Sequence, residues 1–200
     1  SLSVTSEGNV QPKIETKLVS QVAGEVVSIS PSLASGGEFK QGDVLLRLDP
    51  RDYEIALARA QANRKRMQAE KRYADEEAAR IRSLYADELA SVAELQNIER
   101  LQSVAQAAAD DAAAAVDRAK IDLARTVFVA PYNGRVRDEA ADLGQFIPKG
   151  ATMATLYDID RLEVRLPLAD AQLAYLNPSF AQTGLADDTP ANVTLTANYA

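Results

Sequence analysis

The sequence predicts an elongated α+β protein in which an antiparallel α-helical coiled-coil hairpin interrupts a small β-domain made of two halves. Two glycine-marked segments of similar sequence, within 20–49 and 127–160, predict the halves. The two long stretches between them, 51–86 and 92–125, contain no Gly or Pro. Their apolar residues follow a heptad spacing, which predicts a pair of packed helices.

The composition argues against an enzymatic function. It has 200 residues, no Cys, no His and a formal net charge of −7. Without Cys and His it lacks the usual thiol nucleophile, general base and transition-metal ligands, so we expect no enzymatic activity, no metal site and no cofactor. The acidic balance argues against nucleic-acid binding, which depends on neutralising phosphates. The acidic stretches 75–77 and 110–111 are expected to be solvated helix faces, since one face does not converge enough oxygens on an ion.

The two halves of the β-domain are related by an internal repeat. Gly36 and Gly42 match Gly144 and Gly150 at one constant offset, and apolar residues after them match as well. Each half has too little apolar surface to bury a core alone. We therefore expect the halves to pair with each other across the inserted helices.

The first helix is expected at 51–86, with Asp49 as its N-cap and Pro50 at its first position. At 1.5 Å per residue this helix is roughly 54 Å long, so it needs a partner along its length. Eight of the ten seam positions are apolar, Arg64 and Lys71 being the exceptions. The seam consists of Tyr53, Leu57, Ala60, Arg64, Met67, Lys71, Ala74, Ala78, Ile81 and Tyr85.

The second helix is expected at 92–125, because Ser91 and Glu94 form the sequence signature of a capping box. The short connection 87–90 makes the two helices antiparallel neighbours. The seam of the second helix is apolar except at Gln102 and is rich in alanine, which allows close approach. Its positions are Leu95, Ile98, Gln102, Ala105, Ala109, Ala112, Val116, Ala119 and Leu123.

Outer strands are expected on either side of the two halves. Residues 4–19 and the alternating stretch 161–168 read as strands, and the nested order of segments predicts that they pair. A short helix is expected at 169–176 and a last strand at 193–196.

This order of segments resembles that of the periplasmic adaptor, or membrane fusion protein (HlyD-like), family of Gram-negative tripartite efflux pumps and secretion systems. Three segments are very similar in sequence to the corresponding segments of this family: 21–26, 41–49 and 130–136. The resemblance covers roughly 8–200 and implies a split lipoyl-like β-domain flanked by a partial β-barrel domain. The implied division is 1–19 for the first barrel strands, 20–49 and 127–160 for the lipoyl-like halves, 50–126 for the hairpin and 161–200 for the incomplete barrel.

The resemblance also implies a function. It implies a periplasmic adaptor that links an inner-membrane transporter, of the RND type, to an outer-membrane channel of the TolC type for export of small molecules or drugs. It further implies self-association in the assembled pump and anchoring to the inner membrane through an N-terminal segment absent from this chain. An adaptor of an ABC-type exporter or of a type I secretion system is the alternative within the family.

The hairpin tip carries the residues that the resemblance assigns to docking. In the efflux-type, RND branch an Arg, a Leu four residues later and a Ser seven residues further dock the channel, and Arg80, Leu84 and Ser91 have this spacing. Each also has a structural explanation: an exposed helix charge, the closing residue of the seam and an N-cap. Capping and docking by Ser91 are compatible, because the cap shapes the tip that a partner contacts.

Two alternatives belong to other classes of protein. A structural coiled-coil scaffold without a channel partner would show the same hairpin. A lipoyl or biotinyl carrier domain would show the same two halves, but it presents a modifiable Lys at the turn between them. Here the hairpin occupies that turn, and neither Met-Lys-Met nor Asp-Lys-Ala occurs in the chain.

Overall fold

The computed structural model describes residues 9–165, which fall into two compact units divided near residues 14 and 160. One unit contains the strands β1 (Asn9–Pro12) and β10 (Leu162–Arg165). They pair antiparallel from Asn9 opposite Arg165 to Pro12 opposite Leu162. This confirms the expected pairing of the outer strands for their described part. The helix expected at 169–176 and the strand expected at 193–196 lie outside the described residues.

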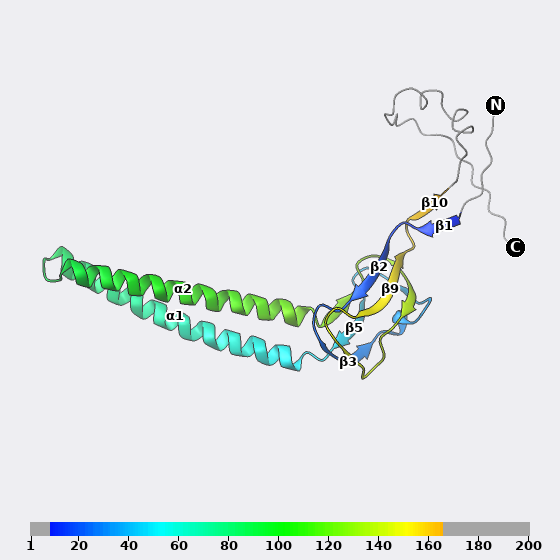
Figure 1. Cartoon of the computed structure of the whole chain (residues 1–200), viewed down its shortest axis with the longest axis horizontal. Coiled ribbons are helices and arrows are strands. Elements are labelled where there is room, and N and C mark those ends of the chain that lie inside the picture. Colours follow the sequence, from blue (N-terminus) through cyan, green and yellow to red (C-terminus); the bar gives the residue numbers. More distant parts are fainter. Residues whose placement is uncertain (1–8, 166–200) are drawn as a thin grey trace, which may run out of the picture. The chain divides into compact units, whose positions relative to one another are not determined.

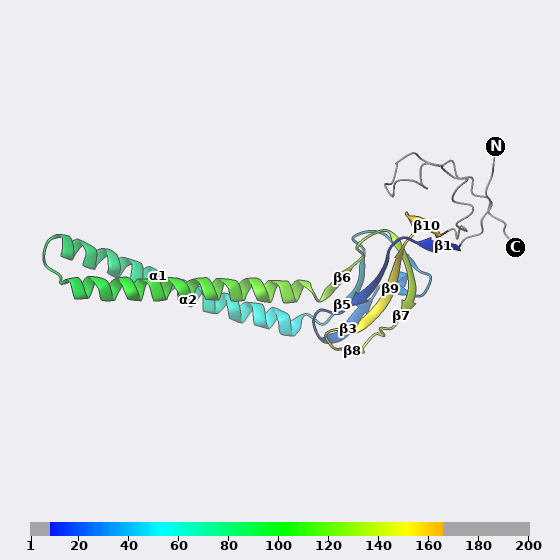
Figure 2. The same ribbon diagram turned by 45° about the horizontal axis from the view of Figure 1, so that its top comes forward.

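The other unit contains a β-sandwich of two four-stranded sheets, with strand orders β2-β9-β7-β4 and β6-β5-β3-β8 (Figure 2). Each sheet contains strands from both sides of the insertion, since β3 pairs with β8, β4 with β7, and β5 with β6. The two halves therefore form one domain, as predicted. The strands are β2 (Glu15–Val19), β3 (Gly24–Ile29), β4 (Glu38–Phe39), β5 (Val44–Leu48), β6 (Val127–Val129), β7 (Gly134–Glu139), β8 (Phe146–Ile147) and β9 (Thr152–Asp158).

Strand β2 belongs to the sandwich, although the sequence pattern grouped residues 1–19 with the outer strands. It pairs with β9 from Glu15 opposite Tyr157 to Val19 opposite Thr152. Its side chains alternate between exposed and half-buried, a pattern that suits either location. The expected boundary at residue 19 therefore differs from the structure, and the rest of the division into domains stays a prediction.

The core of the sandwich draws on both halves. Phe39, Leu45 and Leu48 from the first half pack in one cluster with Met153 and Leu156 from the second, and each is at most 2% exposed. Fully burying a side chain of this size stabilises a fold by about 1.5–3 kcal/mol. Neither half could form this core without the other, so the sandwich holds the two ends of the hairpin together.

The glycine repeat is also a structural repeat. Gly36 and Gly144 have φ of 82° and 79°, and Gly42 and Gly150 have φ of 89° and 90°. Glycine adopts this left-handed region without the steric cost that a Cβ imposes. The backbone bonds repeat too, since Gly36 N–H donates to the carbonyl of Val136 and Gly144 N–H donates to that of Val26, both at 2.8 Å.

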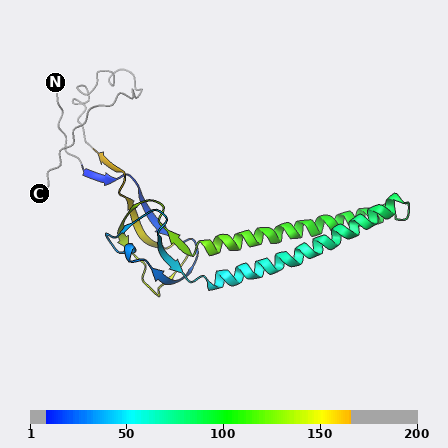
Figure 3. The same cartoon turned by 180° about the vertical axis from the view of Figure 1, so that it is seen from behind.

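The helices α1 (Arg51–Ala86) and α2 (Val92–Ala124) lie side by side along their length (Figures 1 and 3). The carboxylate of Asp49 accepts the N–H of Arg51 at 3.0 Å, while Pro50, already helical at φ −84° and ψ −12°, occupies the cap position. The cap thus lies one residue later than expected, although Asp49 still provides the capping oxygen. Tyr53 donates its hydroxyl to the carbonyl of Ala23 at 2.6 Å, which ties the base of α1 to the sandwich.

The predicted seam is shielded from solvent at every position except Tyr85, which is 40% exposed. Leu84 is half-buried instead. The predicted position of Tyr85 in the seam is wrong, because α2 begins at Val92 and only its first turn lies beside the end of α1. No helix within residues 9–165 combines the length and the hydropathy needed to cross a membrane.

The polar seam residue Gln102 joins the helices near the tip. Its Nε2 donates to Asp75 at 2.7 Å and its Oε1 accepts from Arg82 at 2.6 Å. Asp75 also pairs with Lys71 at 3.2 Å, and Arg82 lies 3.6 Å from Glu99. A polar side chain at a seam position favours the register in which its partners are met. This network therefore fixes the register between α1 and α2. The register determines where the first turn of α2 lies relative to the end of α1, and so the shape of the tip.

Candidate docking site at the hairpin tip

The turn between the helices is closed by backbone hydrogen bonds. Leu89 N–H donates to the carbonyl of Leu84 at 2.8 Å, and Glu88 N–H donates to that of Tyr85 at 3.0 Å. Glu88 is the one non-glycine residue with positive φ among those described, at 62°. Such a conformation is unfavourable for an L-residue and persists where its surroundings hold it. The turn thus has a defined shape.

Ser91 begins α2 with the predicted capping box, which the structure confirms. Its Oγ accepts the N–H of Glu94 at 3.2 Å, and the Glu94 carboxylate accepts the N–H of Ser91 at 2.7 Å and its hydroxyl at 2.8 Å. The backbone N–H of Ser91, and then its hydroxyl, lower the pKa of Glu94 by stabilising the charged carboxylate. The cap accounts for the presence of a serine here without a partner.

We expect the capping box to open in acid. The lowered pKa of Glu94 means that its contribution is present above the ordinary glutamate pKa of about 4.3 and is lost as the pH falls through the lower value of the folded state. Amide hydrogen exchange at Ser91, corrected for intrinsic rates, should therefore accelerate as the pH falls from roughly 5 to 3. The Glu94→Gln variant keeps a capping partner but does not titrate. An equal pH dependence in this variant would contradict the assignment.

Arg80 lies on the last turns of α1 with 59% of its side chain exposed. Its Nε donates to Glu77 at 3.0 Å and its Nη2 contacts the same carboxylate, and this hydrogen bonding raises the pKa of Arg80. The carboxylate of Glu77 thus restrains the guanidinium, which stays charged. Leu84, one turn further, lies on the same side of the helix and is half-buried.

The structure brings the three predicted residues to one end of the hairpin, but it assigns them different local roles. Arg80 is an exposed cation, Leu84 supports the end of the seam and Ser91 caps α2. Their contact with a partner stays a prediction. Among residues 9–165, no group of acidic side chains is arranged to hold a metal ion.

Sequence reasoning missed the apolar side chains that the tip exposes. Leu89 is 74% exposed, Val92 54% and Tyr85 40%. The available signal was Leu89 itself, an apolar residue in a short turn where no seam position could bury it. Apolar side chains gathered at an exposed turn favour contact with another molecule.

Residues 15–160 match the family described as "RND MFP, barrel-sandwich hybrid domain", where MFP denotes membrane fusion protein. A multidrug resistance protein MdtA of Proteus mirabilis is 28% identical over 173 residues, which cover 86% of this chain and 42% of that protein. The MdtA of Yersinia pestis (strain Pestoides F) is 31% identical over 147 residues, covering 74% and 33%. The chain thus spans less than half the length of these relatives.

Solved structures share the fold. A MacA–MexA chimeric protein containing the Pseudomonas aeruginosa MexA α-hairpin domain superposes with a TM-score of 0.60 at 24% identity, over 84% of this chain and 56% of that one. The membrane fusion protein Spr0693 from Streptococcus pneumoniae R6 gives 0.62 at 18% identity, over 85% and 70%. The family match covers both halves of the sandwich and the entire hairpin. The chain therefore belongs to the RND membrane fusion protein family.

Proposed function

We propose that this chain is part of a periplasmic adaptor that joins an inner-membrane transporter to an outer-membrane channel for export of drugs or other small molecules. Family membership and the multidrug resistance relatives support this proposal. An RND-type transporter, a channel of the TolC type and an inner-membrane anchor are the finer parts of the same proposal. In this role the chain connects the transporter to the channel and seals the passage between them, and it catalyses no reaction.

The observation that carries the proposal is the exposed tip of the hairpin. Hydrogen bonds in the turn and in the capping box satisfy backbone groups at the tip, and Glu77 pairs with the charge of Arg80. Leu89 and Val92 are nevertheless left in solvent. Burying such side chains against a partner gains about 25 cal/mol per Å² of apolar surface. A preformed tip on an arm of roughly 54 Å is suited to contact a partner far from the sandwich.

Site-specific crosslinking in cells tests the proposal. Leu89 is the preferred position for a photo-crosslinker, because it is exposed and its side chain makes no hydrogen bond; Ser91 is the second position. Both should capture an outer-membrane channel in cells that produce the complete pump. Asp117, with a side chain 70% exposed in the opposite half of α2, is the control and should not capture it. Absence of an outer-membrane protein at both tip positions would refute the proposal.

A further inference from the structure

Positive charge is concentrated in one short stretch of α1. Residues 61–72 contain five Lys or Arg and one Glu, although the whole chain carries a formal net charge of −7. Two of these cations, Arg64 and Lys71, occupy seam positions, and they are the two polar residues of the α1 seam. The opposite helix presents small side chains here, among them Ala109 and Ala113. The middle of the hairpin therefore has open space beside two charged seam residues.

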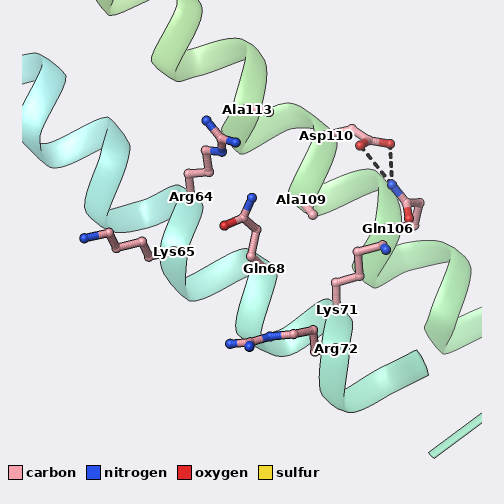
Figure 4. A pocket seen from close by; sticks show the side chains of 9 residues that line it. All are labelled: Arg64, Lys65, Gln68, Lys71, Arg72, Gln106, Ala109, Asp110 and Ala113. Atoms are coloured by element: carbon pink, nitrogen blue, oxygen red, sulfur yellow. Dashed lines mark hydrogen bonds between the residues drawn. The ribbon is translucent and has the colours of Figure 1, made fainter. Parts of the chain in front are cut away.

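This space is a groove of about 700 Å³ between the helices (Figure 4). The charged residues of its lining are Arg64, Lys65, Lys71, Arg72 and Asp110. Gln106 donates to both carboxylate oxygens of Asp110 at 2.9 Å, and this carboxylate forms no ion pair with any of the four cations. The volume is in the range of small-molecule sites. The groove thus combines room for a ligand with a net positive charge.

Three of the four cations have no partner within the described part of the chain. Arg64, Lys65 and Arg72 take part in no ion pair or hydrogen bond there, whereas Lys71 pairs with Asp75 at 3.2 Å. In Figure 4 Arg64 reaches toward α2, while Lys65 and Arg72 point away from it. The unpaired charges therefore surround the α1 side of the groove.

The Nε atom of Arg64 is an independent sign that an acceptor is missing. It is buried and has no hydrogen-bond partner among the residues that the structure describes. Most buried donors are paired, so an unpaired one requires an explanation. Arg binds phosphate through two parallel N–H groups on one edge of its guanidinium. A rotation of the Arg64 side chain into the groove gives Nε such an acceptor.

The spacing of the charges limits the size of a ligand. At 1.5 Å per residue, Arg64 and Arg72 are about 12 Å apart along the helix. Acidic residues follow on both sides of this stretch, 75–77 toward the tip and Asp117 of α2 toward the sandwich. An extended anionic polymer or surface would meet these carboxylates and be repelled. A short ligand would not reach them.

We propose that the groove binds a short, linear ligand that carries two or three linked phosphate groups. Arg64 and Lys71 hold the ligand between the helices, and Lys65 and Arg72 pair with it from the α1 side. Linked phosphates concentrate several negative charges within the length of the groove, and Arg and Lys are the side chains that bind them. By neutralising two seam cations, the ligand also stabilises the middle of the hairpin. The site is separate from the tip and does not depend on the proposed docking.

Isothermal titration calorimetry of the chain with sodium tripolyphosphate tests the site. At an ionic strength of about 0.15 M we expect saturable binding of one ligand per chain. Orthophosphate and citrate should each bind at least tenfold more weakly. No saturable binding of tripolyphosphate would overturn the proposal. Equal affinity for orthophosphate would exclude a linear ligand, and equal affinity for citrate would exclude a preference for phosphate, so either result would overturn it as well.

Two double variants locate the site on the chain. Lys65→Gln with Arg72→Gln removes two exposed cations and should weaken tripolyphosphate binding at least tenfold. Arg59→Gln with Arg100→Gln is the matched control, because both residues are exposed helix cations outside the groove, and it should change the affinity less than twofold. Circular dichroism should show the same helix content in both. Equal losses would indicate general attraction to the hairpin and would refute the site.

Arg64→Met tests the unpaired donor. Met suits a seam position, so without ligand the hairpin should unfold at the same temperature or higher. Tripolyphosphate should nevertheless bind at least tenfold more weakly to this variant. The rise in unfolding temperature that the ligand causes in the original chain should shrink accordingly. Undiminished binding would overturn the proposal, since Arg64 is the residue that joins the seam to the groove.

Vesicles of phosphatidylglycerol distinguish a small ligand from a membrane surface. The chain should not sediment with them, because the acidic residues on both sides of the groove face the same surface charge. Sedimentation that is lost in the variant with Lys65→Gln and Arg72→Gln would assign the groove to a lipid surface. That result would overturn the proposal of a short phosphate ligand.

Discussion

Arg80→Glu is expected to abolish drug export while the adaptor remains folded and abundant. The side chain is 59% exposed and, among the described residues, forms an ion pair only with Glu77 on the same helix, so reversing its charge has little effect on the hairpin. At a docked tip, however, the new carboxylate would be desolvated against a surface selected for a cation. Truncating or reversing one member of a buried charge pair weakens binding strongly. We expect drug susceptibility to rise by about tenfold or more, measured by growth inhibition in a strain that lacks the native adaptor.

Arg118→Glu is the matched control for this experiment. Arg118 is 65% exposed and pairs with Asp122 one turn away at 2.9 Å, so its local chemistry is close to that of Arg80. It lies in the other half of the hairpin, and export should be unchanged. Unaltered export in the Arg80 variant would refute the docking role. Equal loss in both variants would show that helix charge in general, rather than the tip, is required.

Gly134→Ala is expected to destabilise the sandwich strongly. A Cβ at this position would lie 2.2 Å from the backbone oxygen of Tyr157 and 3.0 Å from the ring of Phe39. Gly134 pairs with Phe39 on one side and with Asp158 on the other, so β7 cannot move away from one neighbour without disturbing the other. Overpacking of this kind costs about 3 kcal/mol.

Gly144→Ala separates this steric effect from backbone conformation. Its Cβ would meet no atom within 4 Å, and only its φ of 79° opposes the change. The cost should be about 1–2 kcal/mol. Urea unfolding followed by tyrosine fluorescence reports on the sandwich, since Tyr132 packs against its core. Equal losses of unfolding free energy in the two variants would contradict the argument from close packing.

The sequence predicted the hairpin almost residue by residue. The heptad spacing, the absence of Gly and Pro and the Ser91–Glu94 capping box all act within one helix or between adjacent turns. The pairing of the two halves could also be predicted from the sequence, because Gly36 and Gly42 have counterparts at the same spacing in the second half. The four glycines share one backbone conformation in the structure.

The strands were harder to place. β2 reads like an outer strand but pairs with β9, more than a hundred residues away. Alternation of exposed and shielded side chains identifies a strand and one buried face, but it does not specify the neighbouring strand. The choice between two sheets depends on which edge is free after the two halves have closed, and that is a property of the assembled sandwich.

The candidate docking site was predicted in part. The spacing of Arg80, Leu84 and Ser91 placed them at the tip, while the structure distinguished the exposed cation from the half-buried leucine and the cap. Leu89 and Val92 entered only with the structure. An apolar side chain at a helix end is buried only if the opposite helix extends alongside it. Here the hydrogen bonds of Gln102 fix the register between the helices and therefore decide this.

The sequence by itself determined the two helices, their caps and the repeat of the halves, because hydrogen bonds and side-chain contacts between near neighbours decide these features. Only the tertiary structure decided the partner of β2 and the exposure of Leu89. These depend on the register between segments far apart in the chain. Register is set by packing and polar contacts across the hairpin and the sandwich, which no local pattern contains.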